Sequence, residues 1–245
     1  ITREDRLDNV AKDMVNHYTN RGYSGKAMII CIDRFTTVKM FNKFNYYWKI
    51  KIKSLKKLID TIDVREVRSL REKIKEMEST DMAVVISKSQ NEIKQFEKEG
   101  LDIKPHRKRM EHEDLDNKFK NSEDPLRIVF VCHMWLTGFN VPSLSTLYID
   151  KPMKDQSLMQ AISRPATAIP GKKRAFLISY LDIFRSLKNT LSMYAAPRTT
   201  SEGIFSVQDK DVLLAELSSK TKEMNQYLES ISIDCDKIIA AKGTE

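Results

Sequence analysis

The chain has 245 residues, of which 41% are hydrophobic and only seven are glycine and seven proline. This composition is typical of a globular protein with one large or two smaller domains. The formal net charge of +8 is spread along the chain and favours an anionic partner such as nucleic acid. Three cysteines without a CxxC pair indicate neither a disulfide framework nor a zinc site, and no apolar run approaches a membrane span. We therefore expect a reduced, cytoplasmic protein with no membrane segment.

Five short apolar runs predict the strands of a parallel sheet. They are AMIICI, MAVVIS, RIVFVC, STLYID and RAFLISY, at residues 27–32, 82–87, 127–132, 145–150 and 174–180. Runs that are almost wholly apolar are typical of strands covered on both faces. Apolar residues at helical spacing precede the first run and recur between the others, at 37–48, 89–96 and 157–163. This alternation predicts a doubly wound α/β sheet with flanking helices.

Two segments interrupt the alternation. Residues 49–80 are rich in Lys, Arg and Glu with apolar residues at helical spacing, which predicts a helical insertion. A solvated face is the simpler interpretation of its charges, with a DNA contact as the alternative. Residues 211–241 carry a second helical stripe after the loop 196–208. We place the domain boundary in that loop, which divides the chain into a domain at 1–196 and a linker with the start of a helical region at 197–245.

Polar and basic residues follow the predicted strands. Arg34 comes after the first run, Ser87 and Lys88 after the second, and residues 137–140 after the third. Open parallel sheets bind ligands beyond the carboxyl ends of their strands, and hydroxyl and backbone N–H groups suit phosphate oxygens. The residues therefore predict a phosphate-binding edge.

The loop at 137–140 and the helix near 156–163 are the most specific part of this edge. Gly138 would let a ligand approach the backbone closely, and Gln160 and Arg164 would lie one turn apart on one helix face. The alternative is an ordinary turn followed by a solvated arginine. The pattern alone does not decide between them.

Four stretches carry a resemblance to a known family. They are KAMIICIDRFTTVKMF, TDMAVVISKSQNE, LDIKPHRKRM and PLRIVFVCHMWLTGFNVPSLSTLYIDKPMKDQSLMQAISR. Together they resemble the second RecA-like motor lobe of the R subunit of type I restriction enzymes, which belongs to helicase superfamily two. The resemblance covers about residues 2–184. It implies a RecA-like, mostly parallel sheet followed by a helical segment, in an ATP-dependent DNA translocase and endonuclease subunit.

The resemblance also implies roles for individual residues. Residues 27–34 resemble motif IV, residues 136–142 motif V and residues 160–167 motif VI. ATP would be bound by Gly138, Asn140, Gln160 and Arg164, with Arg164 as the catalytic arginine facing the γ-phosphate. DNA would be bound by Arg34, Ser87, Lys88 and Thr137.

Several positions depart from the family pattern. Thr167 stands where motif VI has a second arginine, and Asn140 where motif V usually has an aspartate. His133 and Gln156 also replace the usual residues, an aspartate and a histidine. Threonine cannot place a fixed positive charge against the γ-phosphate. Natural divergence, an inactive copy of the motor and an uncertain sequence around residues 163–168 all remain open as explanations.

Other parts of such a motor are absent from the sequence. We find no G-x-x-x-x-G-K-[ST] phosphate loop, no Asp-Glu pair for Mg²⁺ and no nuclease triad. The cluster EHED at 111–114 is predicted to cap or solvate a helix and not to bind a metal. We therefore expect a fragment that is inactive alone and binds no cofactor by itself.

The partners follow from the same resemblance. ATP and Mg²⁺ would bind in the complete subunit, together with double-stranded DNA, the first RecA-like lobe, the nuclease domain, and the modification and specificity subunits. Two other classes of function stay open. One is a non-enzymatic nucleic-acid-binding or assembly module with a decayed motor fold, which the altered motif VI supports. The other is a small-molecule α/β enzyme, for which no nucleophile and base pair stands out.

Overall fold

A computed structural model describes residues 1–22, 25–59, 64–136, 139, 141–163, 176–183, 186–187 and 210–230. Side chains are described for these residues except 64–66, 155, 210–216, 227, 229 and 230. The chain divides into two compact units, Ile1–Ala196 and Pro197–Glu245, and each is described by itself.

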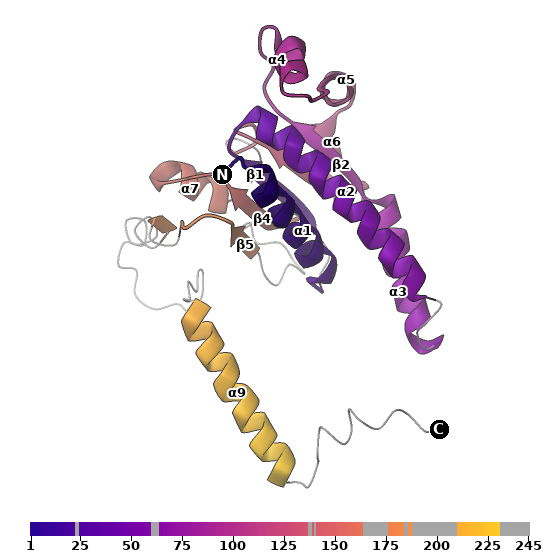
Figure 1. The fold of residues 1–245 in the computed structure, drawn as a ribbon, viewed down its shortest axis with the longest axis vertical. Helices are drawn as coiled ribbons and strands as arrows, with labels where there is room; N and C mark the ends of the chain where they lie inside the picture. Colours follow the sequence, from indigo (N-terminus) through magenta and orange to yellow (C-terminus); the bar gives the residue numbers. More distant parts are fainter. Residues whose placement is uncertain are drawn as a thin grey trace. The chain divides into compact units, whose positions relative to one another are not determined.

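A five-stranded sheet forms the centre of the first unit (Figure 1). Its strands are β1 (Lys26–Cys31), β2 (Asp81–Val85), β3 (Leu126–Val131), β4 (Leu144–Asp150) and β5 (Phe176–Ser179). They lie in the order β2-β3-β1-β4-β5, and all four neighbouring pairs are parallel. Each strand overlaps one predicted apolar run, so the predicted parallel α/β sheet is confirmed.

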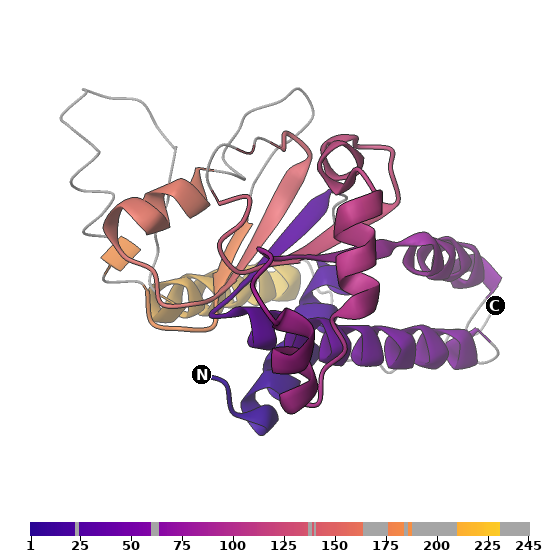
Figure 2. The same cartoon turned by 90° about the horizontal axis from the view of Figure 1, so that it is seen from above.

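Helices cover both faces of this sheet (Figure 2). They are α1 (Glu4–Asn20), α2 (Arg34–Leu58), α3 (Val64–Ser79), α4 (Glu92–Lys98), α5 (Lys104–His112), α6 (Leu115–Lys120) and α7 (Asp155–Ile162). Alternate side chains of a strand point to opposite faces. In β1, Ala27, Ile29 and Cys31 pack with α1 and α2, whereas Met28 and Ile30 pack with α6 and α7. Both faces are therefore buried, which explains the uninterrupted apolar runs.

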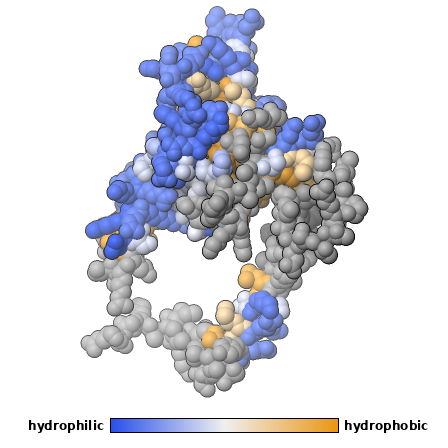
Figure 3. Space-filling view, turned by 180° about the vertical axis from the view of Figure 1, so that it is seen from behind, coloured by the Kyte–Doolittle hydropathy of each residue, from blue (hydrophilic) through white to orange (hydrophobic). Residues whose placement is uncertain are grey.

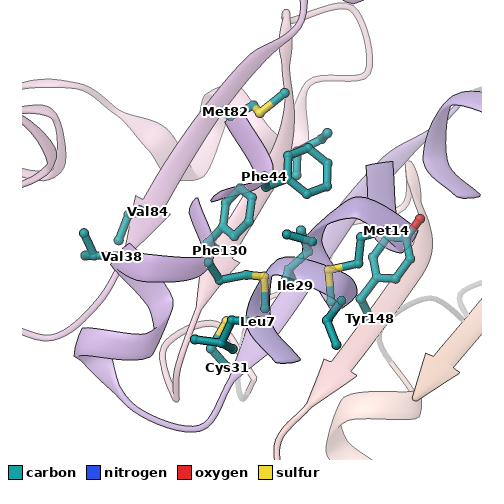
Figure 4. Packing of buried hydrophobic residues seen from close by; sticks show 14 of the residues in the cluster. Leu7, Met14, Ile29, Cys31, Val38, Phe44, Met82, Val84, Phe130 and Tyr148 are labelled. Carbon is teal, nitrogen blue, oxygen red and sulfur yellow. The ribbon is translucent and has the colours of Figure 1, made fainter. Parts of the chain in front are cut away.

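Aromatic rings join α2 to the sheet (Figure 4). The Phe44 ring lies edge-on to Phe130 of β3, with centroids 5.4 Å apart, and stacks on Trp48 at 5.7 Å. The Trp48 indole donates a hydrogen bond to the Met77 carbonyl oxygen at 3.0 Å. This cluster fixes α2 on the sheet and α3 on α2.

The predicted insertion begins inside a helix. Residues 37–48 were expected to form a helix of their own, but α2 continues without a break to Leu58. No glycine or proline interrupts residues 49–58, and Ile52 and Leu55 pack against the core. At about 1.5 Å per residue α2 is about 37 Å long, whereas the six residues of β1 span about 20 Å. The end of α2 therefore extends past the amino edge of the sheet, with α3 beside it (Figure 1).

The second unit is described only as α9 (Lys210–Ser230), which overlaps the helical stripe predicted for 211–241. Leu217 and Met224 on it are 64% and 61% exposed. In the ranges that the structure describes, no helix combines the length and apolar character needed to cross a membrane.

Candidate nucleotide and nucleic-acid site

Hydrogen bonds made by side chains link the carboxyl ends of three neighbouring strands. After β4, the Lys151 Nζ lies 2.6 Å from His133 Nε2 and donates to the Cys132 carbonyl oxygen at 3.2 Å. His133 Nδ1 lies 3.0 Å from the Cys132 Sγ, and this thiol donates to the Ile32 carbonyl oxygen after β1 at 3.5 Å. We call these four residues the strand-end network. They join the ends of β1, β3 and β4.

The hydrogen-bond roles in this network follow from the ammonium group. A lysine ammonium can only donate, so His133 accepts at Nε2 and donates from Nδ1 to the sulfur. Burial, followed by the charge of Lys151, lowers the pKa of His133, and burial raises the pKa of the Cys132 thiol. A neutral imidazole and a protonated thiol are therefore present at pH 7, as the hydrogen bonds require.

The segment after the network is held by stacked aromatic rings. Trp135 stacks on Phe139 with ring centroids 4.2 Å apart, and Phe119 of α6 stacks on Trp135 at 5.8 Å. Trp135 has a φ of 65°, a left-handed conformation that is costly for a bulky residue and is found where surrounding contacts impose it. After β3, the network thus holds Cys132 and His133, and the stack holds Trp135 and Phe139.

Three of the predicted DNA-binding residues lie at the carboxyl edge. The Arg34 guanidinium donates to the Ser89 hydroxyl and lies 3.5 Å from the Gln95 Oε1. Ser87 and Lys88 are exposed after β2, and the Lys88 Nζ lies 2.7 Å from Glu111. The fold brings these residues together, but both cations already have partners, so a phosphate group would compete with them. Thr137 lies outside the described residues.

Of the predicted nucleotide-binding residues, the structure describes only Gln160. It lies half-buried in the last turns of α7, on the segment that follows β4, whereas Ser87 and Lys88 follow β2 at the other side of the sheet. The remaining candidates, Gly138, Asn140 and Arg164, lie outside the described residues, as does Thr167. The roles assigned to all of them stay predictions.

A buried ion pair at the same edge was not foreseen. Asp150, the last residue of β4, is fully buried, and its carboxylate accepts from Arg6 of α1 at 2.5 and 3.1 Å. Arg6 also donates to the Tyr180 carbonyl oxygen at 3.1 Å, and the Asp150 hydrogen bond raises the pKa of Arg6. An aspartate closing an apolar run signals that a partner is required. The sequence does not indicate which of its many cations supplies it.

The acidic cluster at 111–114 has the structural role that was predicted. The Asp114 carboxylate caps α6 by accepting from the Asn117 N–H at 3.1 Å. Glu113 pairs with Arg109 and Lys118, and the Arg109 hydrogen bond, more than that of Lys118, lowers the pKa of Glu113 to about 2. Among the described residues no three His, Cys, Asp or Glu side chains are placed to hold a metal ion.

Known proteins similar to this chain are restriction enzyme subunits. The family model "Type I restriction enzyme subunit R domain 3" matches residues 26–182. The type I restriction enzyme MjaIXP endonuclease subunit of Methanocaldococcus jannaschii is 30% identical over 232 residues, which are 94% of this chain and 18% of that protein. The HindI endonuclease subunit of Haemophilus influenzae is 27% identical over 236 residues, 93% of this chain and 19% of that protein. The chain thus spans about a fifth of the length of these relatives.

A solved structure of a fragment of an HsdR subunit from a Vibrio vulnificus type I restriction enzyme is also similar. It has 15% sequence identity and a TM-score of 0.46, over 79% of this chain and 29% of that one.

Proposed function

Because the chain belongs to the family of type I restriction enzyme R subunits, we propose that it is the second RecA-like motor lobe of an ATP-dependent DNA translocase and endonuclease subunit. The strand-end network is the observation that supports this most directly. It fixes Cys132 and His133, which begin the segment after β3, at the carboxyl edge of a parallel sheet, where such sheets bind ligands. The lobe would comprise residues 1–196, with 197–245 leading into a helical region.

The groups assigned to this edge fit a triphosphate in their chemistry. Gly138 and Asn140 supply backbone and amide groups, Gln160 a side-chain amide, and Arg164 a fixed positive charge. Bound ATP with Mg²⁺ supplies the phosphoanhydride that is hydrolysed. In this proposal Arg164 stabilises negative charge that develops on the γ-phosphate. Mg²⁺ would be held by the phosphates and by the first lobe, in the complete subunit only.

Backbone phosphates of double-stranded DNA would be bound by Arg34, Ser87, Lys88 and Thr137. Arg34 and Lys88 would exchange their present partners, Ser89 and Glu111, for phosphate oxygens. The Arg34–Ser89 pair is partly buried and the Lys88–Glu111 pair is exposed, so the exchange needs no opening of the core. The first lobe, the nuclease domain, and the modification and specificity subunits complete the proposed cytoplasmic assembly.

A non-enzymatic nucleic-acid-binding or assembly module is the second candidate. It is favoured by Thr167, which removes the second arginine of motif VI, and by Asn140, which removes a carboxylate from motif V. Such a module would keep the sheet and its polar edge without nucleotide turnover.

ATP hydrolysis by the complete subunit, with and without duplex DNA, separates the two candidates. We expect Arg164→Ala to lower kcat by about 10³-fold or more, with DNA affinity nearly unchanged, because the charge it stabilises grows mainly in the transition state. Thr167→Arg should raise kcat. The matched control is Arg71→Ala, which removes an exposed arginine of α3 that has no ion pair with a described residue.

Three results would count against the motor. If the wild-type subunit shows no DNA-stimulated ATP hydrolysis, the non-enzymatic module is favoured. An unchanged kcat for Arg164→Ala, at an unchanged melting temperature, would remove the nucleotide-sensing role from this arginine. An equal loss in the Arg71→Ala control would show that the effect is not specific to motif VI.

A further inference from the structure

The second half of α2 carries a concentration of positive charge that the proposed function does not use. Five lysines and no acidic residue occur between Lys49 and Leu58. This part of the helix extends past the amino edge of the sheet, at the opposite end from the strand-end network. The projecting ends of α2 and α3 are mostly hydrophilic in the space-filling view (Figure 3).

Two of these lysines are occupied within the lobe. The Lys51 Nζ donates to the Asn16 side-chain oxygen at 3.3 Å, and the Lys56 Nζ lies 2.7 Å from Glu78. The other three are exposed and make no hydrogen bond or ion pair with a described residue: Lys49, Lys53 and Lys57. We call these three the α2 lysine row.

The row is regular because its members are four residues apart. Four residues advance about 6 Å along a helix and return to nearly the same face. Like charges at this spacing repel one another, and no member of the row has an ion pair with a described acid. Of the acids of α3, Glu78 pairs with Lys56 and Glu72 with Arg68. Among the described residues, the row is therefore a line of cations on one helix face without an ion-pair partner.

We propose that the α2 lysine row binds the sugar-phosphate backbone of double-stranded DNA, as a second contact separate from the carboxyl edge. This inference rests on the proposed DNA-translocating function. Phosphates recur about every 3.4 Å of axis along one strand of a duplex, so a cation every 6 Å meets about every second phosphate. Tyr46 and Ile50 continue the exposed face toward the sheet, at 61% and 43% exposure, and the tyrosine hydroxyl is a further phosphate donor.

Residue type favours DNA over an acidic protein as the occupant of this face. Lysine is depleted in protein–protein interfaces, where arginine is enriched, but it is a common source of sequence-independent phosphate contacts. All three members of the row are lysines. The expected contact therefore adds affinity without reading base sequence.

The test compares two triple variants of the complete subunit. Lys49→Gln with Lys53→Gln and Lys57→Gln removes the row. Lys12→Gln with Lys98→Gln and Lys108→Gln removes the same charge from three exposed lysines on α1, α4 and α5 that have no partner among the described residues. The dissociation constant for a duplex several helical turns long is measured over a series of salt concentrations.

The measured quantity is the slope of the logarithm of the association constant against the logarithm of the salt concentration. In the row variant this slope should be less steep by about 2.7, at about 0.9 for each lost phosphate contact. Between 0.2 and 0.05 M salt the wild-type subunit should then gain about 40-fold more affinity than the row variant. The control variant should change the slope by less than about 1.

Four outcomes would overturn the inference. An unchanged slope in the row variant, with wild-type binding intact, removes the second contact and leaves the proposed function standing. An equal change in the control variant shows a general effect of net charge. An unchanged slope with weaker assembly onto the other subunits identifies a protein partner in place of DNA. Failure of the wild-type subunit to bind DNA at all overturns the proposed function as well.

Discussion

Replacing Arg6 by methionine tests how α1 is attached to the sheet. Asp150 is fully buried at the end of β4, and Arg6 supplies both of the hydrogen bonds to its carboxylate, at 2.5 and 3.1 Å. Methionine has a helix propensity close to that of arginine, so the change removes the cation without weakening α1 itself. A buried carboxylate is then left without its partner.

The size of the effect follows from this burial. Breaking a buried ion pair by removing one member costs about 3–5 kcal/mol, whereas replacing both members by apolar residues is often nearly neutral. Arg6→Met should therefore lower the free energy of unfolding by about 3–5 kcal/mol, which corresponds to a fall in Tm of about 6–20 °C for a domain of this size. Adding Asp150→Leu should recover most of the loss.

Urea unfolding of the chain, followed by circular dichroism, measures these differences. The control is Arg3→Met, because Arg3 and its partner Asp5 are 80% and 62% exposed. Such a fully exposed pair contributes little to stability. The reasoning is refuted if Arg6→Met is as mild as this control, or if the double variant is no more stable than Arg6→Met alone.

Three further predictions concern the core and the strand-end network. Phe44→Ala should lower the free energy of unfolding by about 3–5 kcal/mol, because Phe44 is fully buried against Phe130. The control is Tyr46→Ala, at a 61% exposed position of the same helix, which should change this free energy by less than about 0.5 kcal/mol. Equal effects of the two substitutions in urea unfolding would contradict the prediction. Nitrogen NMR of His133 at pH 7 should show the tautomer with hydrogen on Nδ1, since Nε2 accepts from Lys151, and the opposite tautomer would show that the network is wrong. The pKa of His133 is lowered from 6.5 in the folded protein. The contribution of this group to the free energy of unfolding should therefore be fully present above pH 6.5 and be lost as the pH falls through the lowered pKa. The variant His133→Gln should lack this part of the decline.

The strands could be predicted from the sequence because both faces of the sheet are buried. Runs such as 27–32 and 127–132 then contain almost no polar residue, and this pattern needs no knowledge of the fold. The order of the strands has no comparable signal. β1 lies between β3 and β4, and nothing in its own residues distinguishes these neighbours from β2, because pairing depends on how whole faces pack together.

Three described residues of the candidate site were predicted in position but not in their contacts. Arg34, Ser87 and Lys88 were expected at one edge because parallel strands all end on the same side of the sheet, and the structure places them there. That Arg34 is held by Ser89 could not be predicted, because the contact joins the start of α2 to the segment after β2, which only the strand order brings together. The length of α2 was also underestimated, since the end of a helix without a glycine or proline is set by packing and not by a local signal.

The sequence by itself determined which residues are apolar, which carry charge and on which side of a parallel sheet they fall. Only the tertiary structure decided which of those charges are paired. Asp150 has its cation 144 residues away in Arg6, and Lys151 reaches His133 across 18 residues, while the α2 lysine row is left without any described partner. The physical reason is that hydrogen bonds and ion pairs require approach to about 3 Å. Distances of that kind between segments remote in sequence exist only once the sheet and its helices have packed.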